Sequence, residues 1–126
     1  MVELRRYAGL AALAGTLLAL ALQCAAQGFP SRPIRFVVPF GTGGSPDVIA
    51  RVIGKKLGEN LGQQVVVDNR PGASGIIAAE LVVKAAADGH TLFVCSIHHL
   101  AINPALFPKL PYDPIRDFAP VTLAVT

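Results

Sequence analysis

The sequence predicts an α/β fold built on a parallel sheet. Three short, largely apolar runs alternate with two stretches of helical periodicity, and this order favours βαβ units. Strands that are apolar along their whole length are typical of a sheet covered on both faces. The chain has 126 residues, of which 52% are hydrophobic and 15% charged, so it is excluded from the disordered class and one domain is expected.

The first residues have the layout of a secretory signal peptide. A positively charged start is followed by an uncharged apolar stretch over 8–22 and by small residues at 24–26. This pattern predicts a signal peptide over 1–26, with cleavage before Gln27. Two alternatives remain. A membrane anchor is disfavoured because the apolar stretch is shorter than the roughly 20 residues that a spanning helix needs. A lipoprotein beginning at Cys24 is disfavoured by the bulky glutamine before it.

The first βα unit is expected over 34–62. A β-rich strand at 34–38 leads into a glycine-rich turn at 40–46. A helix should follow, with Ser45 as its N-cap, Pro46 at its first position and Gly62 as its C-cap. Its expected apolar face consists of residues spaced mainly by four and their neighbours: Val48, Ile49, Val52, Ile53, Leu57 and Leu61.

The alternation of strand and helix continues after residue 62 and becomes less regular after residue 95. A strand is expected at 64–68, a helix from about 75 to 86 capped by Ser74, and a strand at 91–95. Prolines break any long helix afterwards, leaving a single helical turn near Ala105 and a strand over 121–125. Two single residues complete the expectations: Cys95 should be a buried small hydrophobe, and His90 should be exposed.

Three loops should leave the carboxyl ends of the strands, where ligands bind in open α/β sheets. They cover 39–47, 69–74 and 96–103. In the first loop, glycines allow close backbone approach, and the following helix offers free N–H groups to an anion. A tight turn that merely needs glycine is the alternative there. For Ser74 in the second loop, simple helix capping is the alternative to ligand contact.

Other chemistries find little support in the sequence. Pro46 occupies the place of the third glycine in a dinucleotide fingerprint, and no P-loop ending is present. His98 and His99 are neighbours that would point to opposite sides of an extended chain, without further metal ligands nearby, so no metal is expected and a surface or ligand-touching polar pair is favoured. Ser96 lies in no nucleophile elbow. The basic residues are scattered, so no nucleic-acid partner is expected.

Several motifs occur in a fixed order along the chain. They are Phe29-Pro30-Ser31-Arg32-Pro33, Val37-Val38-Pro39-Phe40, Asp68-Asn69-Arg70-Pro71-Gly72-Ala73, Asp88-Gly89, Ala101-Ile102-Asn103-Pro104, Lys109-Leu110-Pro111-Tyr112-Asp113-Pro114 and Asp117-Phe118-Ala119-Pro120-Val121. This series resembles the Bug family of extracytoplasmic solute receptors. These are the substrate-binding proteins (TctC type) of tripartite tricarboxylate transporters.

The resemblance implies a type II periplasmic-binding-protein fold, of which 27–126 would form only the N-terminal part of domain one. It implies a periplasmic, monomeric, non-enzymatic receptor without cofactor or metal. Such a receptor captures a small carboxylate and delivers it to membrane permease subunits. It places ligand contacts on the three loops: Phe40, Gly41, Thr42, Gly43, Gly44, Ser45, Asp47, Ser74, Gly75, Ser96, Ile97 and His98.

The chain also departs from the family pattern. Gly41 and Thr42 replace the usual prolines, and His98 and His99 replace small or hydroxyl residues, so ligand preference does not carry over. Family members are more than twice as long, which predicts a marginal, aggregation-prone fold with an open sheet edge. Two alternatives stay open: a secreted α/β enzyme acting on a phosphate ester through the glycine loop, and a non-functional fragment.

Overall fold

In the computed structural model, residues 28–125 are described, and every described helix and strand lies in the unit that begins at Arg32. The expected signal peptide, 1–26, lies outside the described residues. Within the described range, no helix has the length and hydropathy to cross a membrane.

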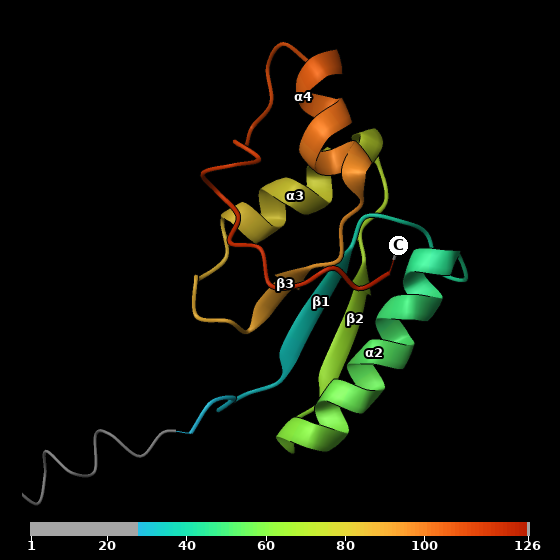
Figure 1. Cartoon of the computed structure of the whole chain (residues 1–126), viewed down its shortest axis with the longest axis vertical. Coiled ribbons are helices and arrows are strands. Elements are labelled where there is room, and N and C mark those ends of the chain that lie inside the picture. Colours follow the sequence, from blue (N-terminus) through green and yellow to red (C-terminus); the bar gives the residue numbers. More distant parts are fainter. Residues whose placement is uncertain (1–27, 126) are drawn as a thin grey trace, which may run out of the picture. The chain divides into compact units, whose positions relative to one another are not determined.

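A three-stranded parallel sheet forms the centre of this unit (Figure 1). It consists of β1 (Ile34–Val38), β2 (Val65–Asn69) and β3 (Thr91–Phe93), in the order β2-β1-β3. The predicted α/β class and all three strands are confirmed, with β3 two residues shorter than expected. β1 is the middle strand and the most buried one, because strands flank it on both edges and helices cover both its faces.

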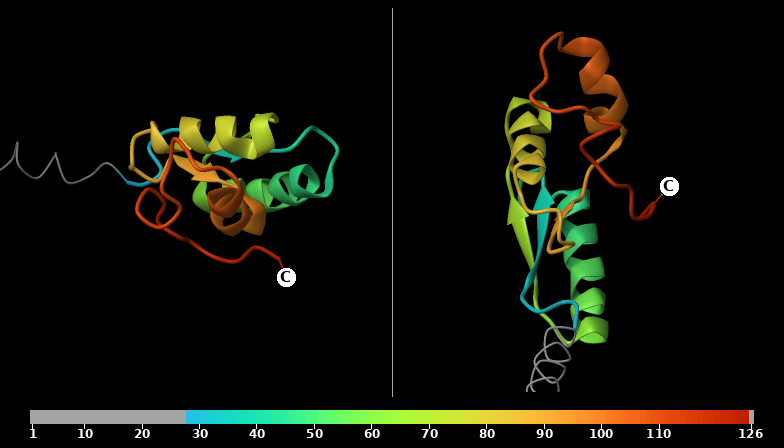
Figure 2. Two further views of the ribbon diagram at one scale, coloured as in Figure 1. Left: turned by 90° about the horizontal axis from the view of Figure 1, so that it is seen from above. Right: turned by 90° about the vertical axis from the view of Figure 1, so that its left-hand side faces the viewer.

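Two helices cover opposite faces of the sheet (Figure 2). Helix α2 (Ser45–Leu61) packs on β1 and β2, whereas α3 (Ile76–Val83) packs on β1 and β3. The buried hydrophobic residues therefore come mainly from β1 and from small residues on the helices. They are Ile34, Phe36, Val37, Val38, Ala50, Ala78 and Ala79, with Tyr112 from the later chain.

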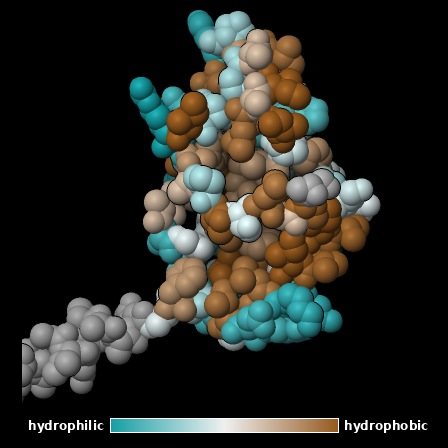
Figure 3. Space-filling view, in the orientation of Figure 1, coloured by the Kyte–Doolittle hydropathy of each residue, from teal (hydrophilic) through white to brown (hydrophobic). Residues whose placement is uncertain are grey.

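Helix α2 approaches the sheet with its small residues, which the periodicity did not predict. A Cβ added to Gly54 would lie 3.0 Å from Cγ1 of Val65, and one added to Gly58 would lie 2.8 Å from the carbonyl oxygen of Gln63. The close approach at these glycines rotates much of the expected apolar face away from the sheet. Val48 is 51% exposed and Val52 is 61% exposed. Apolar surface therefore gathers over α2 in the space-filling view (Figure 3).

The two helices begin differently from the expected caps, whereas the expected C-cap of α2 is present. Gly44 is the N-cap of α2 without any side-chain hydrogen bond, so Ser45 already belongs to the helix. Ser74 also caps nothing: it lies in the turn η1 (Ala73–Gly75) with a φ of 53°, and Gly75 precedes α3. The predicted C-cap Gly62 is confirmed by its left-handed conformation, φ 66°.

The chain after β3 is mostly irregular. A π-helical turn, η2 (His98–Ile102), leads into the short helix α4 (Asn103–Leu106), which confirms the predicted turn near Ala105. The predicted strand over 121–125 is wrong: this segment is exposed and pairs with no strand among the described residues.

Two single-residue expectations are also wrong. Cys95 is exposed, because β3 ends at Phe93 and the chain leaves the sheet before reaching it. His90 is only 6% exposed, because the turn before β3 folds its ring back onto Asp88. Its backbone N–H also donates to the carboxylate of Asp88 at 3.0 Å.

Candidate functional site

An open pocket of about 380 Å³ lies beyond the carboxyl ends of β1 and β2, where their loops meet η2 and α4. Its walls come from three chain segments that are distant in sequence, 39–40, 72–75 and 98–106. The lining residues are Pro39, Phe40, Gly72, Ser74, Gly75, His98, His99, Ile102, Asn103 and Leu106. The parallel sheet explains this convergence, because parallel strands deliver their following loops to one edge.

Asp47 holds the glycine-rich loop after β1. Its side chain is 2% exposed, and its carboxylate accepts the backbone N–H of Gly43 at 2.8 Å. Arg51, one helical turn later, donates to both carboxylate oxygens at 3.0 and 3.1 Å. These hydrogen bonds, from Arg51 first and Gly43 second, lower the pKa of Asp47 to about 2. Asp47 is therefore an anion whose acceptors are occupied by the protein.

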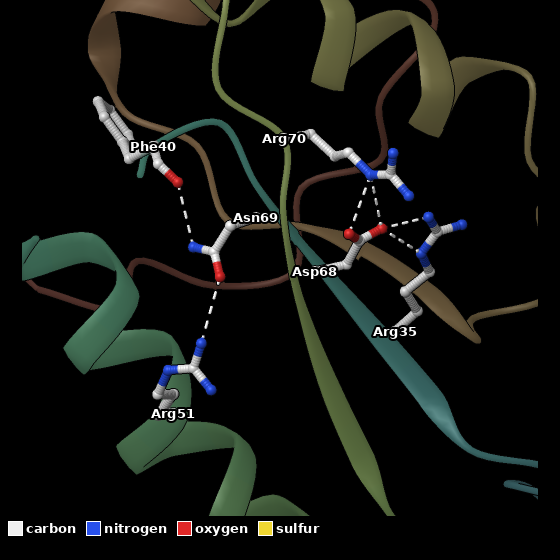
Figure 4. A network of polar contacts seen from close by, with 6 residues as sticks. All are labelled: Arg35, Phe40, Arg51, Asp68, Asn69 and Arg70. Carbon is white, nitrogen blue, oxygen red and sulfur yellow. Dashed lines mark hydrogen bonds and ion pairs between the residues drawn. The ribbon is translucent and has the colours of Figure 1, made fainter. Parts of the chain in front are cut away.

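Asn69, the last residue of β2, ties the first loop to the second strand (Figure 4). Its amide nitrogen lies 3.1 Å from the carbonyl oxygen of Phe40 and 3.0 Å from the carboxylate of Asp47. Its carbonyl oxygen accepts from Arg51 at 3.2 Å. The position of Phe40 at the pocket wall thus depends on a polar network beneath it.

Two further arginines near this edge are engaged with a carboxylate (Figure 4). Nε of Arg35 donates to Asp68 at 2.8 Å, and Nε of Arg70 contacts both oxygens of Asp68 at 2.9 and 3.1 Å. Burial opposes ionisation of Asp68, but the arginines outweigh it and lower the pKa of this carboxyl group. No lysine or arginine from the described part of the chain lines the pocket itself.

Gly75 and His99 are in direct contact across the pocket wall. A Cβ added to Gly75 would lie 2.2 Å from Nε2 of His99 and 3.0 Å from Cβ of Pro39. Gly75 also has a φ of 79°, a left-handed conformation that disfavours any side chain. Glycine is therefore required at this position both by backbone geometry and by space.

The ring of His99 is enclosed by aromatic residues and hydrogen-bonded on one side. It packs edge-on against Phe40 and Phe93, with ring centroids 5.5 Å apart in both pairs. The backbone N–H of Ser96 donates to Nδ1 at 3.1 Å. Burial lowers the pKa of His99 and outweighs the backbone hydrogen bond with Ser96, which raises it, while the charge of His98 lowers it a little further. His99 is therefore a neutral imidazole at physiological pH.

Asn103 and Tyr112 fasten η2 to the rest of the pocket. Asn103 donates to the carbonyl oxygen of Ser74 at 2.9 Å, which links the second and third loops. The hydroxyl of Tyr112 donates to the carbonyl oxygen of His99 at 2.6 Å. Both side chains are buried, so these bonds are shielded from competing water.

The structure brings together only some of the candidate residues taken from the sequence. Phe40, Ser74, Gly75 and His98 line the pocket. The loop residues Gly41, Thr42, Gly43, Gly44 and Ser45 are exposed beside it, and Asp47 lies in the network below. Ser96 lies next to the pocket through its bond to His99, whereas Ile97 is 66% exposed.

The expected ligand contacts did not include six of the lining residues, which are Pro39, Gly72, His99, Ile102, Asn103 and Leu106. One sequence pattern could have indicated Asn103, namely the Ile102-Asn103-Pro104 motif, because an asparagine that is buried there needs hydrogen-bond partners. The contact of His99 with Gly75 joins residues far apart in the chain, and no local pattern reports it.

A parallel α/β layer with a pocket at its carboxyl edge has the architecture of the open α/β sheets, in which ligands bind at that edge. The comparison with family models identifies the family. The model "TctC: Tripartite tricarboxylate transporter family receptor" matches residues 49–126, and the chain belongs to this family.

Curated relatives agree with this assignment. A UPF0065 protein of a Pseudomonas species is 54% identical over 98 residues, covering 78% of this chain and 29% of the relative. Protein BugT of Bordetella pertussis is 45% identical over 105 residues, covering 82% of this chain and 32% of the relative. The chain thus spans about a third of the length of the curated relatives it matches.

Solved structures support the same fold. MatC of Rhodopseudomonas palustris with bound malate is 46% identical, with a TM-score of 0.70 over 74% of this chain and 32% of MatC. A second R. palustris protein, solved with adipate, is 42% identical, with a TM-score of 0.66 over 69% of this chain and 29% of that protein. The fold class is therefore an α/β periplasmic-binding-protein layer, of which this chain matches only a part.

Proposed function

We propose that this chain forms the first part of domain one of a periplasmic receptor that binds a small organic carboxylate. The observation that carries the proposal is the pocket at the carboxyl edge of the sheet, bordered by Ser74 and Gly75 immediately before α3. The first N–H groups of a helix have no partner within the helix and attract anions. The malate and adipate of the related structures are small dicarboxylates that suit such a site.

The pocket is built to hold an anion without a counter-charge of its own. The arginines near this edge are paired with Asp47 and Asp68. Charge on a ligand would therefore be met by backbone N–H groups, hydroxyls and neutral side chains. Such a site permits release, because no strong ion pair has to be broken. This property suits a receptor that delivers its ligand to membrane permease subunits.

The proposed receptor acts in the periplasm. Residues 1–26 act as a signal peptide and direct the chain to the periplasm, where it acts as a monomeric receptor for a tripartite tricarboxylate transporter. Membership of a receptor family favours binding over catalysis. The alternative of a phosphate-ester hydrolase receives no support from the relatives.

Thermal unfolding with a panel of acids tests the proposal. Malate, adipate and citrate are added as sodium salts at equal ionic strength, with sodium chloride and the dimethyl esters as controls. A ligand at 100 times its Kd stabilises the native state by about 2.7 kcal/mol, so one acid should raise the midpoint while its ester does not. If every acid behaves like sodium chloride, the chain binds none of these carboxylates and the proposal fails for them.

A further inference from the structure

The second ring nitrogen of His99, Nε2, is a polar atom without a hydrogen-bond partner among residues 28–125. His99 is 2% exposed and lines the pocket. Among the described residues, its hydrogen bonds involve only Nδ1 and the backbone. Nε2 is also absent from the side-chain atoms that are sealed from solvent without a partner. It therefore keeps some access to solvent beside Gly75, which lines the same pocket.

The hydrogen bond at Nδ1 decides which nitrogen carries the proton. A backbone N–H can only donate, so Nδ1 of His99 accepts from Ser96 and carries no hydrogen of its own. In the neutral ring the proton then lies on Nε2. His99 thus presents an N–H donor to the pocket, as required for contact with a carboxylate oxygen.

The donor is also held in place before any ligand arrives. Phe40 and Phe93 fix the plane of the ring, and Tyr112 holds the backbone carbonyl of the same residue. Gly75 leaves the space that Nε2 needs, since a Cβ there would overlap it. A donor that is already oriented loses little conformational entropy on binding.

We propose that Nε2–H of His99 donates a hydrogen bond to an oxygen of the bound carboxylate, making His99 a specificity-determining residue of this receptor. The proposal rests on the proposed function and names one of its contacts. The sequence analysis expected the neighbouring His98 to contact the ligand. His98 also lines the pocket, but it is exposed.

Two substitutions of His99 test the roles of its ring nitrogens Nδ1 and Nε2 separately. In His99→Asn, the amide oxygen can keep the acceptor for Ser96, but the pocket donor is lost. In His99→Gln, the longer amide can place an N–H near the position of Nε2. We expect His99→Asn to weaken binding of the best acid from the panel about tenfold or more, and His99→Gln to weaken it about threefold or less. Equal losses in both variants, or none in either, would overturn the proposal.

A measurement on the unaltered chain avoids any effect of substitution on folding. Acetate is titrated as a simple carboxylate probe, while NMR follows the backbone amides of Ser74 and Gly75 and the Nε2–H of His99. We expect all three to shift together, with Nδ1 of His99 remaining unprotonated. If the amides shift but Nε2–H does not, the role of His99 is refuted while the proposed function survives. If neither moves with acetate or with any acid of the panel, both fail.

Discussion

Replacing Gly75 by alanine should destabilise the chain severely, although it adds a single methyl group. The left-handed φ of 79° costs an alanine about 1–2 kcal/mol. The added Cβ would also lie 2.2 Å from Nε2 and 2.3 Å from Cδ2 of His99, an overlap that the packed ring can relieve only by moving. Overpacking of this kind costs about 1–3 kcal/mol, so the total is roughly 2–5 kcal/mol.

Urea unfolding followed by circular dichroism measures this loss. With a slope of about 1–3 kcal/mol per M, the midpoint should fall by about 1 M or more. Gly41→Ala is the matched control, because Gly41 lies in the neighbouring loop without a positive φ, and no atom lies within 4 Å of its added Cβ. It should change stability by no more than about 0.5 kcal/mol.

A double-mutant cycle separates the two causes. In a His99→Ala background the ring is gone, so Gly75→Ala should cost only the backbone part, about 1–2 kcal/mol. If Gly75→Ala is as stable as the parent chain, or costs the same with and without the ring, the contact between Gly75 and His99 does not have the importance assigned to it.

Three further substitutions test other contacts. Gly58→Ala should destabilise α2 by about 1–2 kcal/mol in thermal unfolding, the reverse of the usual gain in a helix, because its Cβ would lie 2.8 Å from the carbonyl oxygen of Gln63; a gain in stability would contradict the close packing of α2. Tyr112→Phe should lower the free energy of unfolding, measured by urea unfolding, by about 1–2 kcal/mol, because it removes the hydroxyl that donates to the carbonyl oxygen of His99. An unchanged unfolding midpoint would mean that this hydrogen bond contributes nothing to stability. Asp47→Asn should reduce the acid sensitivity of the chain: the pKa of Asp47 is lowered from 3.8 to about 2, so its contribution to stability is complete above pH 3.8 and is lost as the pH falls through 2, while Asp88, whose pKa is also lowered to about 2, keeps the variant partly acid-sensitive. Unfolding midpoints that fall equally in parent and variant over that range would refute this assignment.

Local patterns predicted the framework of the fold well. The strand positions and the extent of α2 follow from β-branched runs and helical periodicity, which are properties of neighbouring residues. The face that α2 turns to the sheet was mispredicted, because hydrophobicity alone ranks Val48 and Val52 above Gly54. The close approach that Gly54 and Gly58 permit decides the packing instead, and only the partner strand reveals it.

The site was predicted at the right edge of the sheet but with the wrong emphasis. Most of the expected contacts lay in the glycine-rich loop, yet the glycines of this loop are exposed. Its Asp47 accepts a hydrogen bond from the backbone of the same loop. His99 was expected only as one member of a surface or ligand-touching polar pair, and the assumption of an extended chain gave no reason to prefer it to His98. The π-helical turn η2 buries His99 and leaves His98 exposed, and such a turn has no simple sequence pattern.

The order of the strands also affects when the layer can form. β1 is made first, yet it is the central strand, and its partners begin with Val65 on one edge and Thr91 on the other. Neither edge can be satisfied by local pairing, since both partners come after long crossovers. A growing or translocating chain therefore has no complete sheet until Phe93 has emerged. The proposed export in an unfolded state is compatible with this delay.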